Sequence, residues 1–169
     1  MVNKTLLSYK TKSFVKKNTA QRSSMAYNSA ETIGIVFSID DEKKHESIKR
    51  LIHSLENDGK KVEVLAYLPK KKDNHEFLFD FFTVKDLNFW GSFTSHKVEQ
   101  FAAKTFDYLF YIDLESNAFI RNILAMSKAK CRVGKFNEEN EPFCEMMIQT
   151  ANNIDNLVDE MYKYTKILS

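Results

Sequence analysis

The feature that most constrains the fold is an apolar run followed by an amphipathic segment and a second apolar run. The first run, Ile33 to Ile39, is nearly continuous, as expected for a central strand covered on both faces. The next segment carries apolar residues three and four positions apart, which gives a helix one buried stripe: Ile48, Leu51, Ile52 and Leu55. With a second strand at Val62–Leu68, this order predicts a βαβ unit with parallel strands and a right-handed crossover.

The ends of this first helix are marked by residues with known preferences. Asp40 and Asp41 precede it, where a carboxylate suits the positive end of the helix dipole. Gly59 follows it and can take the left-handed conformation that ends many helices.

The rest of the chain continues the alternation of strands and helices. We expect a strand or a short helix–strand pair at 77–82, strands at 108–112, 131–136 and 143–148, and helices at 95–104, 117–128 and 153–167. This rhythm predicts an α/β fold with a doubly wound, mostly parallel sheet, Rossmann-like or flavodoxin-like. The order of the strands is not readable from the pattern.

The charge is divided unevenly along the chain, although the net charge of the 169 residues is only +2. Residues 1–30 contain no acidic residue and carry six cations: Lys4, Lys10, Lys12, Lys16, Lys17 and Arg22. The spacing of apolar residues predicts a basic amphipathic helix over residues 4–17, and the polar, small residues 18–30 are typical of a linker. We therefore expect a basic N-terminal arm at 1–30 and a single α/β domain at 31–169.

Ligands of open α/β sheets bind outside the carboxyl ends of the strands, which directs attention to two loops. Ser38 and Asp40 follow the first strand, and Asp113 and Asn117 follow the strand at 108–112. The first loop contains no glycine, whereas phosphate-binding loops need glycine for close approach of the backbone, so no nucleotide cofactor is expected. The carboxylates could hold Mg²⁺, but helix capping explains them more simply, and we assign no metal and no catalytic residue.

Several other features narrow the class of protein. Cys131 and Cys144 lack metal-ligand or disulfide spacing and are expected to be reduced thiols in the cytoplasm. No apolar run is long enough to span a bilayer. The Phe-rich segment 77–93 could offer a surface to a protein partner, although core packing is the simpler explanation.

Three segments of the chain, together with the helix between the first two and the closing strand and helix, resemble an uncharacterised family of short α/β proteins from Bacteroidota. They are SSMAYNSAETIGIVF at 23–37, KKVEVLAYLPKK at 60–71 and DYLFYIDLESNAFIRNILAMSKAKCRVGKF at 107–136. The resemblance covers nearly the whole chain and implies the fold and a cytoplasmic bacterial setting, but no activity.

Residues 107–136 are also similar to a segment in the N-terminal half of heptosyltransferase-like glycosyltransferases. There a strand ending in Asp precedes a helix and a basic strand, which here reads AKCRVGKF from Ala129 to Phe136. Those enzymes bind the sugar nucleotide mainly in a second Rossmann domain, for which this chain has no room. The resemblance therefore implies at most a lone, repurposed half.

These observations lead to one main hypothesis and two alternatives. The main hypothesis is a non-catalytic adaptor whose basic arm docks on an anionic macromolecular surface, with ribosomal RNA as first choice. One alternative is association with an anionic membrane face. The other is a small-ligand binder or enzyme that uses Asp40 and Asp113. Reading of DNA sequence is not expected.

Overall fold

The computed structural model describes residues 1–74 and 78–168 and contains one six-stranded sheet. All of its strand pairs are parallel, and the strand order is β3-β2-β1-β4-β5-β6. The strands are β1 Thr32–Ser38, β2 Lys61–Tyr67, β3 Asp80–Phe82, β4 Tyr108–Tyr111, β5 Cys131–Lys135 and β6 Met146–Ile148. This is the order of a Rossmann-type doubly wound sheet, so the predicted fold class is confirmed.

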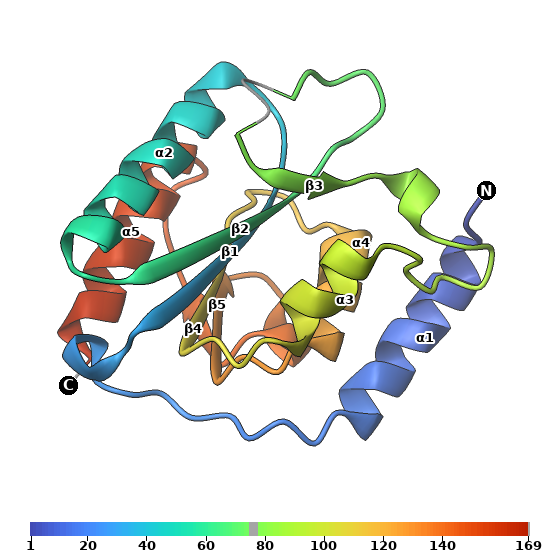
Figure 1. Cartoon of the computed structure of the whole chain (residues 1–169), viewed down its shortest axis with the longest axis horizontal. Helices are drawn as coiled ribbons and strands as arrows, with labels where there is room; N and C mark the ends of the chain where they lie inside the picture. The colour runs from blue at the N-terminus through green and yellow to red at the C-terminus, as the bar shows by residue number, and fades with distance from the viewer. Residues whose placement is uncertain (75–77, 169) are drawn as a thin grey trace.

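Among the described residues, five α-helices cover the two faces of the sheet, and short 3₁₀ turns lie at 27–29, 84–86 and 141–143. The helices are α1 Lys4–Lys17, α2 Glu42–Asn57, α3 His96–Ala103, α4 Ala118–Met126 and α5 Ile154–Ile167. Figure 1 shows α2 and α5 side by side on one face, and α1, α3 and α4 on the other. The helix predicted at 4–17 is confirmed, and the cap at Gly59 has the expected positive φ of 79°.

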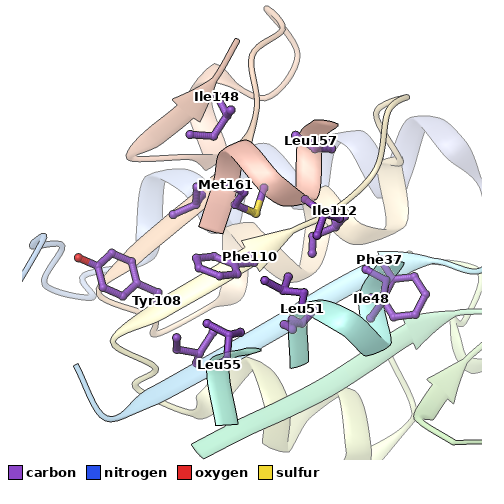
Figure 2. Packing of buried hydrophobic residues seen from close by; sticks show 14 of the residues in the cluster. Phe37, Ile48, Leu51, Leu55, Tyr108, Phe110, Ile112, Ile148, Leu157 and Met161 are labelled. Atoms are coloured by element: carbon purple, nitrogen blue, oxygen red, sulfur yellow. The ribbon is translucent and has the colours of Figure 1, made fainter. Parts of the chain in front are cut away.

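The larger core lies between the sheet and the layer formed by α2 and α5. Figure 2 shows Leu51 and Leu55 of α2 and Met161 of α5 packed toward Phe110 of β4. All four are at most 2% exposed. The stripe predicted from spacing in α2 is therefore the buried one, with the exception of Ile52, which is only partly buried.

Some predicted limits differ from the observed ones. The expected strand at 143–148 begins only at Met146, because Pro142 and Phe143 lie in a 3₁₀ turn that ends two residues before the strand begins, after Cys144 and Glu145. The third strand is shorter than 77–82 and spans Asp80–Phe82, while Phe77 lies outside the described residues.

The N-terminal helix is packed against α4 in the second helical layer. Leu7 is 2% exposed, and the side-chain amide of Asn122 donates a hydrogen bond of 2.8 Å to the buried hydroxyl of Thr11. At the end of the helix, the Asn18 side chain donates to the carbonyl of Ala125. The segment after it passes the amino-terminal ends of the strands, where the Ser23 amide donates to the Lys130 carbonyl, and leads to β1 (Figure 1). Helix α1 is thus part of the packed body.

Candidate functional site

The carboxyl ends of β1 and β4 meet where the strand order reverses, and a network of polar side chains joins them. Asp113 accepts hydrogen bonds from the backbone amide and the hydroxyl of Ser38, at 2.8 and 2.7 Å. The Ser38 hydroxyl also accepts from the Asn117 amide at 3.0 Å. Three of the four loop residues selected from the sequence are therefore in contact at the switch point.

A buried lysine completes this network. The Nζ atom of Lys44 lies 2.5 Å from Asp113, and the two side chains are only 8% and 3% exposed. Lys44 is not among the residues predicted from the sequence, although the pattern of α2 contains a signal for it. Lys44 precedes Ile48, Leu51 and Leu55 at helical spacing and so continues the buried stripe of α2.

Two expectations about the carboxylates in these loops need refinement. Asp41, and not Asp40, caps α2, since its side chain accepts from the Lys44 amide. The proposed capping role of Asp113 before the next helix is wrong, because Asn117 caps α4 through the amides of Phe119 and Ile120. Asp113 instead ties β1 and α2 to β4.

Asp40 lies apart from that network but borders the same cavity. It forms an exposed ion pair with Lys72 at 2.8 Å, and the hydrogen bond from Lys72 holds the pKa of Asp40 below its usual value. Asp40 and Asp113 both line a cavity of about 460 Å³, which we call the switch-point cavity. Within residues 1–74 and 78–168, no three His, Cys, Asp or Glu side chains are grouped as metal ligands.

A second, larger cavity of about 860 Å³ lies beside the first and shares Pro69, Ser116 and Asn117 with it. We call it the α1 groove, because one side of α1 forms its wall. The opposite wall comes from the end of β2, the first turn of α4 and the segment 138–143. Its apolar lining consists of Leu7, Val15, Tyr67, Pro69, Ala118, Phe119, Pro142 and Phe143.

The six cations of the N-terminal segment are separated by the packing of α1. Lys4, Lys12 and Lys16 are exposed and line the α1 groove. The other three lie elsewhere: the Lys10 ammonium donates to the Ser92 hydroxyl, Lys17 is exposed outside the groove, and Arg22 pairs with Glu145 at 3.6 Å.

A fourth cation reaches the groove from the opposite wall. Arg121 of α4 lines it and forms an ion pair of 3.4 Å with Glu139, whose side chain is 62% exposed. The groove lysines have no ion-pair partner among the residues that the structure describes. The groove is therefore apolar along its walls, and its charged lining consists of four cations, Lys4, Lys12, Lys16 and Arg121, and two carboxylates, Glu138 and Glu139.

The family model that matches this chain is described as a family of unknown function, DUF6913, and the match covers residues 4–168. The chain belongs to this family. No curated protein and no solved structure matches the chain. The matched region includes α1, both cavities and all six strands, so the whole described body is the family's domain.

The Phe-rich segment 77–93 divides between core and surface. Phe82 and Phe93 are buried, at 0% and 7% exposure, and their rings pack edge to face. Phe89 and Trp90 are 53% and 65% exposed. Core packing thus accounts for part of the segment, and among its described residues Phe89 and Trp90 are the exposed aromatic side chains.

Both cysteines are free thiols, and burial raises the pKa of Cys131 to about 11 and that of Cys144 to about 12. Such thiols are poor nucleophiles near neutral pH, because the thiolate is the reactive form.

In the part of the chain that the structure describes, no helix has the length and apolar character needed to cross a bilayer.

Proposed function

We propose that this protein is a non-catalytic binding protein that holds a small organic anion in the α1 groove. One observation carries the proposal: Lys4, Lys12 and Lys16 line an apolar groove and have no ion-pair partner among the described residues. The groove volume of about 860 Å³ falls within the range of about 300–1,000 Å³ typical of small-molecule sites. The groove borders the switch-point cavity, which occupies the usual ligand position in such sheets.

The charge pattern of α1 supports an anionic ligand. Lys12 and Lys16 are one helical turn apart, and α1 contains no acidic residue to separate them. A like-charge pair at this spacing destabilises a helix by about 0.2–0.5 kcal/mol. A bound anion would remove that repulsion, so the arrangement suits binding better than it suits stability.

Binding, rather than catalysis, fits the state of the neighbouring polar groups. Asp113 is hydrogen-bonded to Ser38 and Lys44, and Asp40 is paired with Lys72. These side chains satisfy one another and hold the ends of the strands together. We therefore assign them a positioning role beside the groove.

The test uses 1-anilinonaphthalene-8-sulfonate, an aromatic anion, as the probe in isothermal calorimetry with the full chain. We expect saturable binding that Ser8→Trp weakens at least tenfold, because Ser8 is exposed and lines the groove. Thr5→Trp is the matched control, since Thr5 is exposed on the same helix but does not line the groove. Equal binding by both variants would contradict the proposal.

Docking on ribosomal RNA is a second proposal, and the exposure of Lys17 in addition to the three groove lysines favours it. Lysines that contact phosphates release counterions, so such binding weakens steeply with salt. We expect the protein to co-sediment with ribosomes at low salt, and Lys17→Gln to weaken this without changing probe binding in the groove. Failure to sediment, with flotation on anionic liposomes instead, would favour the membrane alternative.

The finer parts of the sequence interpretation remain proposals as well. They are the cytoplasmic setting in Bacteroidota, the descent from half of a heptosyltransferase-like enzyme, and a protein partner for segment 77–93. The exposed pair of Phe89 and Trp90 supports the last of these.

A further inference from the structure

We infer that the ligand of the α1 groove is a free, single-chain amphiphile with an anionic head group, such as an alkyl carboxylate or alkyl phosphate. This inference rests on the proposed function and specifies its ligand class. It follows from three properties of the groove: its elongated wall, its apolar lining and the position of its cations.

The wall that α1 contributes to the groove is long and narrow. Groove-lining residues run from Lys4 to Lys16, which is about 18 Å of helix at about 1.5 Å per residue. Leu7 and Val15 line this wall, and Phe119 and Phe143 line the opposite side. An extended alkyl chain can contact such a wall along its length, whereas a compact polar anion would leave most of it facing water.

The cations are placed at different levels of the groove. The hydrogen bonds from Asn122 to Thr11 and from Asn18 to Ala125 show that α1 and α4 run in the same direction. Arg121 directly precedes Asn122, so along the helix axes it lies within about one turn of Lys12.

We place the anionic head group at this cluster of three cations, which we call the cationic end: Lys12, Lys16 and Arg121. The alkyl chain then extends past Leu7 toward Pro69 and Asn117, at the boundary with the switch-point cavity. Glu138 and Glu139 also line the groove. Arg121 is already paired with Glu139, and Lys4 lies about 12 Å from Lys12 along α1, so Lys12 and Lys16 are the unpaired cations left at this end to hold the head group.

The experiment measures displacement of the sulfonate probe by octanoate, decanoate and dodecanoate, all below their micelle concentrations. We expect affinity to rise about fourfold for each added methylene, which corresponds to about 0.8 kcal/mol. Dodecanol, which has the chain without the charge, should bind at least tenfold more weakly than dodecanoate. Affinity independent of chain length, or equal affinity for the alcohol, would overturn the inference.

Two variants locate the head group. Lys12→Gln/Lys16→Gln should reduce the affinity for dodecanoate at least tenfold and leave that for dodecanol unchanged. Lys17→Gln is the matched control, because Lys17 is an exposed lysine of the same helix outside the groove. Equal losses in the two variants would overturn the placement.

The outcomes separate this inference from the proposed function. If the probe binds in a way that Ser8→Trp weakens but no alkyl carboxylate displaces it, the amphiphile is wrong and the anion-binding function stands. If the probe does not bind in the groove, both fail. If vesicles of phosphatidylglycerol bind the protein through Lys12 and Lys16 while monomeric dodecanoate does not, a membrane lipid is the source and the free amphiphile is wrong.

Discussion

The two cavities at the carboxyl ends of the strands share three residues but differ in whether their charged side chains have ion-pair partners. In the switch-point cavity, Asp113 is paired with buried Lys44 and Asp40 with Lys72. In the α1 groove, three lysines have no anionic partner among the described residues. The buried pair of Lys44 and Asp113 links α2 to the end of β4, whereas the Asp40–Lys72 pair is exposed and contributes little to stability. Lysines that remain unpaired along an apolar groove are available to a ligand. The difference supports the proposal that the α1 groove, and not the switch-point cavity, binds the ligand.

The largest effect should come from breaking the buried pair. Lys44→Met leaves Asp113 without its cation, and we expect a loss of about 3–5 kcal/mol in the free energy of unfolding, measured by urea denaturation. Lys43→Met is the matched control, because Lys43 lies on the same helix with a side chain that is 60% exposed. Its effect should stay below about 1 kcal/mol. Similar losses in both variants would show that the switch-point cavity is not stabilised by this pair.

The next effect concerns the contact between Gly91 and α1, the helix that forms one wall of the groove. Gly91 has a φ of 77°, and an added Cβ would lie 2.8 Å from the Cα atom of Leu7. Gly91→Ala should therefore destabilise the protein by about 2 kcal/mol or more and speed hydrogen exchange in α1. Gly59→Ala has the same type of backbone strain, with a φ of 79° and no atom within 4 Å of the added Cβ. It should cost about 1–2 kcal/mol and leave exchange in α1 unchanged.

A smaller effect of opposite sign would sharpen the comparison. Lys12→Glu places an acidic residue one turn before Lys16, so it replaces repulsion with attraction on α1. We expect the protein to gain about 0.5 kcal/mol in stability while binding of the sulfonate probe falls at least tenfold. A loss of stability would indicate that Lys12 has a structural role.

The smallest effect is on the pKa of Asp40 in the switch-point cavity. Lys72→Gln should raise the pKa of Asp40 toward the usual value of about 3.9, measured by NMR. Because the folded-state pKa of Asp40 is lowered, its stabilising contribution is present above that usual value and is lost as the pH falls through the folded value. The variant and the native protein should therefore converge in stability in acid. An unchanged pKa would show that Lys72 does not hold Asp40.

Much of the fold could be predicted because it depends on local patterns. The spacing of Ile48, Leu51 and Leu55 identified the buried face of α2, and Gly59 marked its end. The candidate loops were found through the general position of ligands in parallel sheets, and Ser38, Asp113 and Asn117 do meet there. The groove could not be predicted, because its walls come from four segments that are distant in the sequence.

The sequence by itself determined the α/β class, the helix at the N-terminus and the concentration of positive charge in the first thirty residues. The spacing of apolar residues determines these features because it selects which side of each helix or strand is buried. It does not select the neighbour against which that side packs. The tertiary structure alone decided the strand order, the seat of α1 on α4 and the separation of the six cations, of which three line the groove. Long-range packing determines which lysines of α1 line the groove, because the hydrogen bond between Thr11 and Asn122 fixes how α1 is rotated about its axis.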